Sequence, residues 1–106
     1  MVGGIYFIDM PYSDFKQFKA RPVLVIKIID KNDLLILPLT TNLEREGIVL
    51  TKNDLKTSYL KKKSVVIVPK LTAVDQSLIS EQNHIATLNE KTFKLVLDDI
   101  CLKFEC

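Results

Sequence analysis

Short apolar runs alternate with polar, turn-forming segments along most of the chain. The runs at residues 4–10, 22–29, 34–39 and 64–68 are rich in branched and aromatic side chains, which is typical of β-strands. Residues 22–29 contain hardly any polar position, so we expect this strand to be buried on both faces. Shorter strands are expected at 47–50 and 84–88, and the strand that begins at Ser64 is expected to continue past Pro69 toward Val74.

Polar segments connect these strands. Residues 30–33 form a tight turn, whereas residues 11–20 form a loop that is long for a hairpin. Residues 52–63 are rich in lysine and are predicted to be irregular, with one helical turn from Asn53. Because long loops often hold binding groups, the loop at 11–20 is a candidate location for function.

The C-terminal segment has a different period. Phe93, Leu97, Ile100 and Phe104 recur at helical spacing behind Asn89, a favourable N-cap, so an amphipathic helix is predicted over 90–104. We interpret its apolar face as a core or dimer contact. Several strands followed by one helix predict a mainly β (α+β) fold, a small antiparallel barrel with a helix packed on it. The 106 residues are expected to form a single domain, 1–106.

Net charge, apolar run length and cysteine content exclude few classes of function. A net charge of +2 does not by itself indicate nucleic acid, so any site for a polyanion must come from local clustering. The longest apolar runs are far shorter than the ~20 residues that span a bilayer, and the N-terminus has no secretory pattern. The two cysteines do not form a disulfide framework, so reduced thiols and a cytoplasmic location are expected.

Familiar catalytic motifs are missing from the sequence. There is no C-x-x-C, H-E-x-x-H, glycine-rich phosphate loop or G-x-S-x-G, and there is one histidine, so neither a metal site nor a cofactor site is expected. The remaining candidates are polar residues at strand ends: Arg21 where a loop meets a strand, and residues 40–42 where a strand meets a loop. If residue 30 pairs with 33 in a hairpin, residue 22 lies opposite 41, and Arg21 approaches Thr40 or Thr41.

A guanidinium beside hydroxyls suits a phosphate, because arginine can bond two phosphate oxygens at once and threonine can donate another hydrogen bond. The long loop would add Ser13, Lys16 and Lys19 at the same edge. The alternative interpretation is a salt-bridged arginine near an ordinary turn.

Four segments resemble successive blocks of the MazF/PemK/Kid toxin family, in order and with matching spacing. They are GIYFIDMPYSD, KARPVLVI, ILPLTTN and LKKKSVVIVPKLTAVDQSLI. The resemblance implies an SH3-like barrel, a homodimer, and a metal-independent endoribonuclease of a type II toxin–antitoxin system that cleaves single-stranded mRNA. It also implies an acidic antitoxin as partner, with any contact to DNA running through that antitoxin.

The resemblance also assigns roles to residues. The essential arginine of the family falls on Arg21 and its essential hydroxyl residue on Thr40, which we take as the catalytic pair. Some relatives have an arginine or an acidic residue where this chain has Ile67 and Pro69, and Lys70 is the nearest charged group. The expected substrate-binding residues are Tyr12, Ser13, Asp14, Lys16, Lys19, Thr41, Asn42 and Lys70.

The general base stays open. Asp14 is an acidic group in the long loop, but a loop aspartate normally titrates near ~4 and is a weak base. Tyr12 or Phe18 could stack an unpaired base, and the lysines at 61–63 could neutralise phosphates or form a solvated loop. Two other functions remain: a toxin-like module that binds a protein target, as the related gyrase poison does, and a barrel that binds RNA without cleavage.

Overall fold

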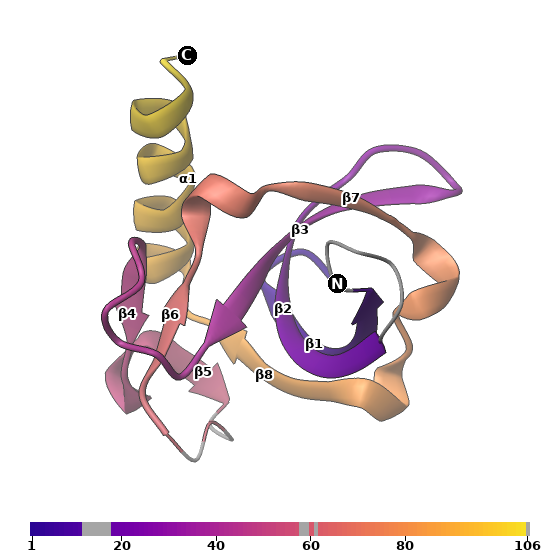
Figure 1. Cartoon of the computed structure of the whole chain (residues 1–106), viewed down its shortest axis with the longest axis horizontal. Coiled ribbons are helices and arrows are strands. Elements are labelled where there is room, and N and C mark those ends of the chain that lie inside the picture. The colour runs from indigo at the N-terminus through magenta and orange to yellow at the C-terminus, as the bar shows by residue number, and fades with distance from the viewer. Residues whose placement is uncertain (12–17, 58–59, 61, 106) are drawn as a thin grey trace.

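The computed structural model describes residues 1–11, 18–57, 60 and 62–105. As predicted from the sequence, its strands come first and a helix follows them at the C-terminus (Figure 1). The strands are β1 (Gly4–Pro11), β2 (Phe18–Ile28), β3 (Asp33–Thr40), β4 (Ile48–Leu50), β5 (Leu55–Thr57), β6 (Ser64–Val66), β7 (Thr72–Asp75) and β8 (His84–Leu88). The 3₁₀ segments are η1 (Lys52–Asp54), η2 (Val68–Lys70), η3 (Gln76–Leu78) and η4 (Glu81–Asn83), and α1 (Glu90–Phe104) ends the chain.

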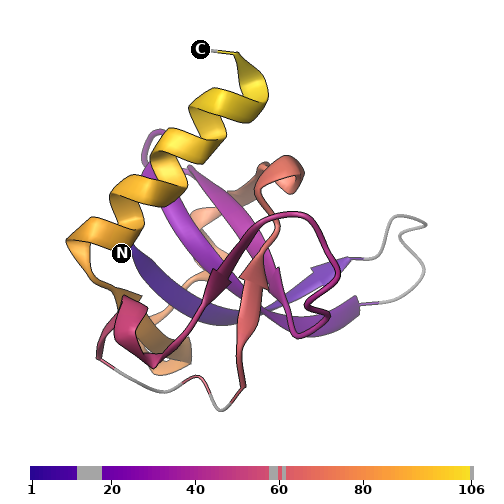
Figure 2. The same ribbon diagram turned by 90° about the vertical axis from the view of Figure 1, so that its left-hand side faces the viewer.

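The described strands form an antiparallel, nearly closed barrel. Hydrogen bonds join them in the order β4-β6-β3-β2-β1-β8-β5, and β7 pairs with β3. Strands β1 and β2 curl through the middle of the view, and α1 stands along one side of the barrel (Figures 1 and 2). The mainly β fold with one C-terminal helix is therefore confirmed.

The central strands contribute to two hydrophobic cores. Leu24 of β2 packs with Val96 of α1 on one face, whereas Val23 packs with Ile36 and Ile79 on the other. Side chains alternate between the faces of a strand, so a strand with a core on each side needs a continuous apolar run. The prediction of burial on both faces is confirmed for residues 23–26, and the strand becomes exposed from Lys27 onward.

The register between β2 and β3 differs from the predicted hairpin. Val23 lies opposite Pro38, and the ladder shifts between Val25 and Lys27. Extended by two residues beyond the pair of Val23 and Pro38, the observed register would put Arg21 opposite Thr40. The predicted pairing of residue 22 with 41 is therefore wrong by two positions. A bulge of this kind leaves one residue unpaired and has no clear signal in an unbroken apolar run.

The strand that begins at Ser64 ends earlier than predicted. β6 stops at Val66, and Pro69 lies within η2, so the chain turns before it resumes as β7 at Thr72. A proline has no N–H to donate to a ladder, which explains the interruption. The predicted helical turn near Asn53 is present as η1, whereas β5 was not predicted.

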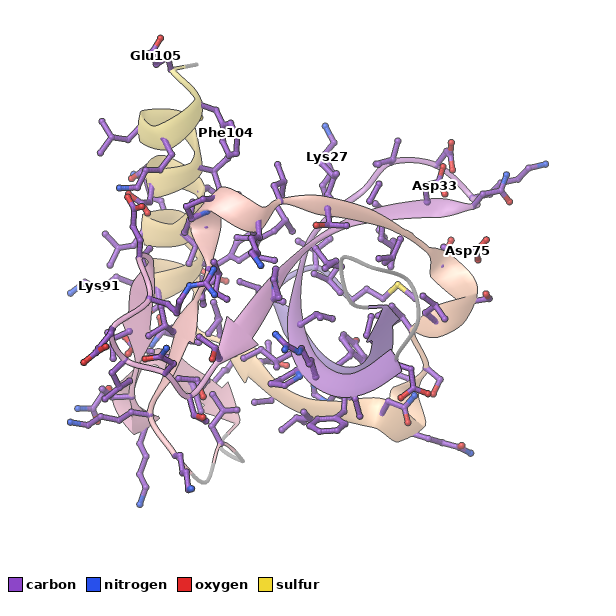
Figure 3. All side chains as sticks on the ribbon, in the orientation of Figure 1. Lys27, Asp33, Asp75, Lys91, Phe104 and Glu105 are labelled. Carbon is purple, nitrogen blue, oxygen red and sulfur yellow. The ribbon has the colours of Figure 1, made fainter. Side chains whose placement is uncertain are left out.

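The C-terminal helix has the predicted bounds and the predicted cap. The Asn89 side chain accepts a hydrogen bond of 2.8 Å from the backbone N–H of Thr92. Phe93 and Ile100 pack against the core, but Leu97 and Phe104 are exposed, so only part of the predicted apolar face is buried. Phe104 lies near the C-terminal end of α1 (Figure 3). Across the described ranges, α1 included, no helix has the length and apolar character needed to cross a membrane.

Cys101 lies in the last turns of α1 and takes part in a disulfide bond, so the expectation of reduced thiols is wrong for this residue. Two cysteines are too few for a framework of several disulfide bonds, but they are enough for a single disulfide bond.

Candidate functional site

Arg21 lies inside β2, not at its entrance. The strand already begins at Phe18, and Arg21 pairs with Ile8 of β1. The expected loop-to-strand junction is therefore corrected: Arg21 occupies the part of β2 that extends beyond the ladder with β3, which starts at Val23. Pro22 fits this position because β2 has a partner on only one side there, the setting in which strands tolerate proline.

Thr40 is the last residue of β3, one residue beyond the predicted end of this strand at Leu39, and it pairs with Val65 of β6. Side-chain alternation puts Thr40 on the same face as Ile36, and it puts Arg21 on the same face as Val23. Ile36 and Val23 belong to one core cluster, so Arg21 and Thr40 share a face at the same end of neighbouring strands.

Local hydrogen bonds hold the turn after β3. The backbone N–H of Asn42 donates to Thr40 Oγ1 over 3.1 Å, and the N–H of Glu44 donates to Asn42 Oδ1 over 3.1 Å. These are turn contacts of the kind that short polar side chains make with nearby backbone. A hydroxyl that accepts such a bond can still donate its own hydrogen to a bound group. The side chain of Asn42 has a structural task here in addition to its predicted binding role.

The remaining predicted residues are placed unevenly. Tyr12, Ser13, Asp14 and Lys16 lie outside the described residues. Lys19 lies within β2, opposite Met10, and not in the loop where it was expected. Lys70 is exposed and lies in η2. Just before η2, the backbone N–H of Ile67 donates to the carbonyl oxygen of Pro38 in β3. The chain therefore leaves β3 before Lys70, which does not lie at the end of β3 that holds Thr40.

The structure adds a largely apolar cavity of about 380 Å³ beside the same strand ends. We call it the aromatic cleft. Its lining includes Phe7, Pro22, Thr41, Leu60, Lys62 and Ile85. Pro22 and Thr41 are the chain neighbours of Arg21 and Thr40, so the cleft opens on the other face of the same end of the sheet. The Phe7 side chain is 46% exposed, although it lies in a run that looks like buried strand.

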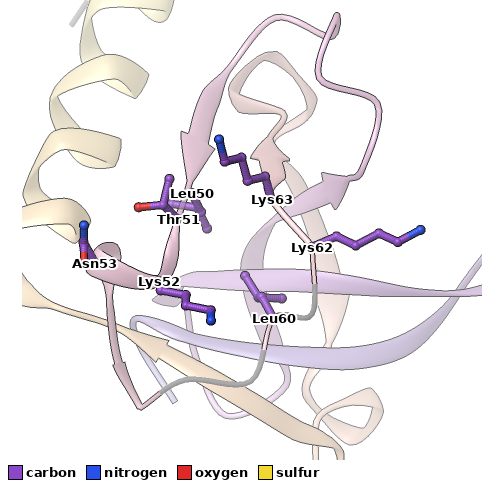
Figure 4. A pocket seen from close by; sticks show the side chains of 7 residues that line it. All are labelled: Leu50, Thr51, Lys52, Asn53, Leu60, Lys62 and Lys63. Atoms are coloured by element: carbon purple, nitrogen blue, oxygen red, sulfur yellow. The ribbon is translucent and has the colours of Figure 1, made fainter.

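A second cavity, of about 390 Å³, lies between η1 and the segment that leads into β6. We call it the lysine pocket. Its lining includes Leu50, Thr51, Lys52, Leu60, Lys62 and Lys63 (Figure 4). Lys62 and Lys63 extend to opposite sides of the segment that leads into β6, and the tip of Lys52 lies toward Leu60 (Figure 4). The sequence offered the lysine run at 61–63 as a signal; Lys52 begins the same lysine-rich segment, 52–63, but was not singled out as a binding residue.

Asp54 fixes the wall of the lysine pocket to α1. Its Oδ1 accepts a hydrogen bond of 2.9 Å from the Thr92 hydroxyl, and its Oδ2 accepts bonds of 2.8 Å from the Thr51 N–H and 3.1 Å from the Thr51 hydroxyl. Partial burial alone would raise the pKa of Asp54, but the hydrogen bonds from Thr51 and Thr92 together outweigh it, so the pKa is lowered. η1 is therefore held by a carboxylate that is ionised at neutral pH.

His84 lies outside this arrangement. Its ring packs on Tyr6 with ring centroids 5.1 Å apart, and its Nε2 lies 2.9 Å from Thr87 Oγ1. Burial and the nearby Glu81 carboxylate raise the pKa of Tyr6. Within the part of the chain that the structure describes, no group of three or more histidine, cysteine, aspartate or glutamate side chains could hold a metal ion.

The described residues define a class of small, mainly antiparallel β proteins in which a nearly closed barrel is followed by one C-terminal helix. Within that class, the family of PemK-like, MazF-like toxins of type II toxin–antitoxin systems matches residues 1–104, and the chain belongs to this family. No curated protein sequence matches the chain.

Proposed function

We propose that this toxin is a metal-independent endoribonuclease that cleaves single-stranded mRNA, with Arg21 and Thr40 as its catalytic residues. The carrying observation is the placement of Arg21 and Thr40 on one face at the end of adjacent strands, in a chain that belongs to the MazF-like family. A guanidinium with a fork of N–H donors and a nearby hydroxyl is a combination that suits a phosphodiester.

The proposed reaction uses the ribose 2′-hydroxyl as nucleophile. The 2′ oxygen forms a bond to phosphorus while its proton leaves, the bond from phosphorus to the 5′ oxygen breaks, and that oxygen takes up a proton. The products are a 2′,3′-cyclic phosphate and a 5′-hydroxyl. Negative charge accumulates on the phosphorane oxygens, so donors aimed at them lower the barrier.

Arg21 stabilises the phosphorane, since its guanidinium stays protonated at neutral pH and cannot act as the base. Thr40 donates a hydrogen bond to a non-bridging oxygen. Loss of one donor of this kind typically lowers the rate by about 10²–10³. Tyr12, Ser13, Asp14, Lys16, Lys19, Thr41, Asn42 and Lys70 are the proposed binding residues; Lys70 lies in η2, away from the end of β3 that holds Thr40.

The proposed partners follow from the family. An acidic antitoxin would occupy the cationic end and block RNA, and contact with DNA would run through that antitoxin. A homodimer is supported by the apolar side chains that α1 leaves exposed, Leu95, Leu97, Leu102 and Phe104. We place the protein in the cytoplasm, where mRNA is the available substrate, and we treat residues 1–106 as one domain.

The experiment is cleavage of a defined single-stranded RNA in the presence of EDTA, followed by mapping of the cut sites and end groups. We expect cyclic phosphate and 5′-hydroxyl ends. Thr40→Ala and Thr41→Ala form a matched pair, because alternation puts Thr40 on the face of Arg21 and Thr41 on the other face. The first variant should lower kcat, and the second should act mainly on KM. Intact RNA with a folded wild-type protein would contradict the proposal.

A second candidate is a barrel that binds a protein target and does not cleave RNA. The observation in its favour is that Ile67 is 2% exposed and Pro69 has no polar group, so the positions that are charged in some relatives supply none here. Capture of one protein partner together with intact RNA would support this function over the first.

A further inference from the structure

The aromatic cleft and the lysine pocket adjoin each other. Leu60 and Lys62 line both cavities, so the two adjoin along this segment and together extend from Pro22 and Thr41 to η1. We call this joined depression the track. Of the polar residues that the sequence singled out at the strand ends, Thr41 lines the start of the track, and Lys62, Lys63 and Lys52 lie along its length.

One end of the track is suited to a flat apolar group. Phe7 is 46% exposed, and Pro22 and Ile85 lie around the same cavity. Aromatic side chains in this position stack unpaired nucleobases, and stacking tolerates any base because every base has a π face. Phe7 belongs to β1, which pairs with both β2 and β8, so it projects from a rigid element.

The other end of the track is suited to negative charge. Lys52, Lys62 and Lys63 line the pocket, and the described lining residues of both cavities include no carboxylate. Lys52 comes from η1, which Asp54 ties to α1, so this cation does not depend on a free loop for its position. Clustered cations next to an aromatic platform are the usual combination for single-stranded nucleic acid.

We infer that the track binds the unpaired nucleotides next to the scissile phosphate of a single-stranded RNA. One base lies against Phe7, and the following phosphates lie along Lys62, Lys63 and Lys52. This inference rests on the proposed function, because it extends the substrate from the catalytic pair around the strand ends onto the other face of the sheet, where the aromatic cleft opens. It makes Phe7 a binding residue and makes RNA length beyond the cut a determinant of affinity.

An acidic protein segment is the competing occupant of a lysine-lined depression. The aromatic cleft favours RNA, since acidic chains gain nothing specific from a half-exposed phenyl ring, whereas each stacked base does. The two occupants differ in what the Phe7 side chain contributes, and this difference can be measured.

The test measures kcat and KM separately on a single-stranded RNA with one mapped cut site. Lys52→Gln/Lys63→Gln should raise KM by about 2- to 30-fold with kcat unchanged. The double variant should also reduce the slope of log KM against log salt by about 1.4, since each phosphate contact on a single strand contributes about 0.7. Phe7→Leu should raise KM by about 5- to 150-fold, and Phe7→Tyr should retain most of the affinity.

Lys27→Gln is the matched control. Lys27 is an exposed lysine on the part of β2 that lies at the opposite end of the barrel from the lysine pocket, so its loss should leave KM and the salt slope unchanged (Figure 3). A second arm uses an RNA trimmed at each side of the cut. Wild-type protein should lose affinity for one of the two trimmed RNAs, and the double lysine variant should not distinguish that RNA from the full-length one.

If the RNA is cleaved but the track variants match the wild type in KM and salt slope, the inference is wrong and the proposed function stands. If wild-type protein leaves the RNA whole, the proposed function fails, and the same variants are then compared for binding of the uncut RNA by fluorescence anisotropy. Loss of affinity in Phe7→Leu and in the double lysine variant supports the track. Unchanged RNA affinity, together with lost affinity for a poly-glutamate peptide, assigns the depression to an acidic protein segment and overturns the inference.

Discussion

The Thr92–Asp54 hydrogen bond joins the helix to the wall of the lysine pocket, and its removal gives a sharp stability prediction. Thr92 is 3% exposed and donates to Asp54 Oδ1 over 2.9 Å. Thr92→Val keeps the shape of the side chain and removes the donor. A hydrogen bond to a charged group contributes ~1.5–3 kcal/mol, but Asp54 is partly open to water, so the lower end applies and the expected cost is about 1–2 kcal/mol.

The pH dependence separates this bond from a packing effect. The folded-state pKa of Asp54 is lowered, so its contribution is complete above the ordinary aspartate pKa of about 3.9 and is lost as the pH falls through the lower folded-state value. The difference in free energy of unfolding between wild type and Thr92→Val should therefore shrink in that acidic range. Urea unfolding followed by circular dichroism at neutral and acidic pH measures it.

Two further variants complete the test. Thr92→Ser keeps the hydroxyl and loses a methyl group, so it should cost only about 0.8 kcal/mol and show no acid dependence of its own. In a double-mutant cycle, Thr92→Val and Asp54→Ala should couple by about 1–2 kcal/mol at neutral pH. A coupling of zero at neutral pH, or a coupling that grows in acid, would show that the Thr92–Asp54 hydrogen bond does not stabilise the fold as an ionic contact.

The other two predictions concern two glycine positions and a surface ion pair. Gly47→Ala should destabilise the protein far more than Gly3→Ala, because a Cβ at Gly47 would lie 1.9 Å from the Val66 carbonyl oxygen. At Gly3 only the positive φ of 83° disfavours alanine, at a cost of about 1–2 kcal/mol. Thermal unfolding of the two variants compares these effects. Lys103 donates to Glu46 over 2.8 Å, and this hydrogen bond and the charge of Lys103 lower the pKa of Glu46, so NMR titration of Lys103→Met should show that pKa rising toward its ordinary value while stability barely changes.

Much of the fold could be predicted because each element has a local cause. The unbroken apolar run around Leu24 requires two cores, and Asn89 followed by an amphipathic pattern fixes the start of the helix. What could not be predicted depends on distant partners. The bulge between Val25 and Lys27 moves the register without changing the hydrophobic pattern, and β5 exists because it pairs with β8.

The residues of the candidate site also differ in whether the local sequence or a distant partner determines their role. Arg21 and Thr40 could be proposed from the sequence because their strands and the family blocks surround them. Phe7 and Lys52 could not, since Phe7 lies in a run that looks like buried strand and Lys52 lies far along the chain from it. The folded barrel places the strand β1 and the segment η1 beside two cavities that share Leu60 and Lys62.

Substitution of Arg21 tests the central claim most directly. The measurement is the single-turnover rate of cleavage of one defined single-stranded RNA in EDTA, compared between wild type, Arg21→Lys and Arg21→Ala, with folding checked by circular dichroism. Arg21→Ala should lower the rate by at least about 10²–10³, and Arg21→Lys should recover only part of it, because lysine keeps the charge but lacks the planar fork. Cleavage by folded Arg21→Ala at the wild-type rate would contradict the account.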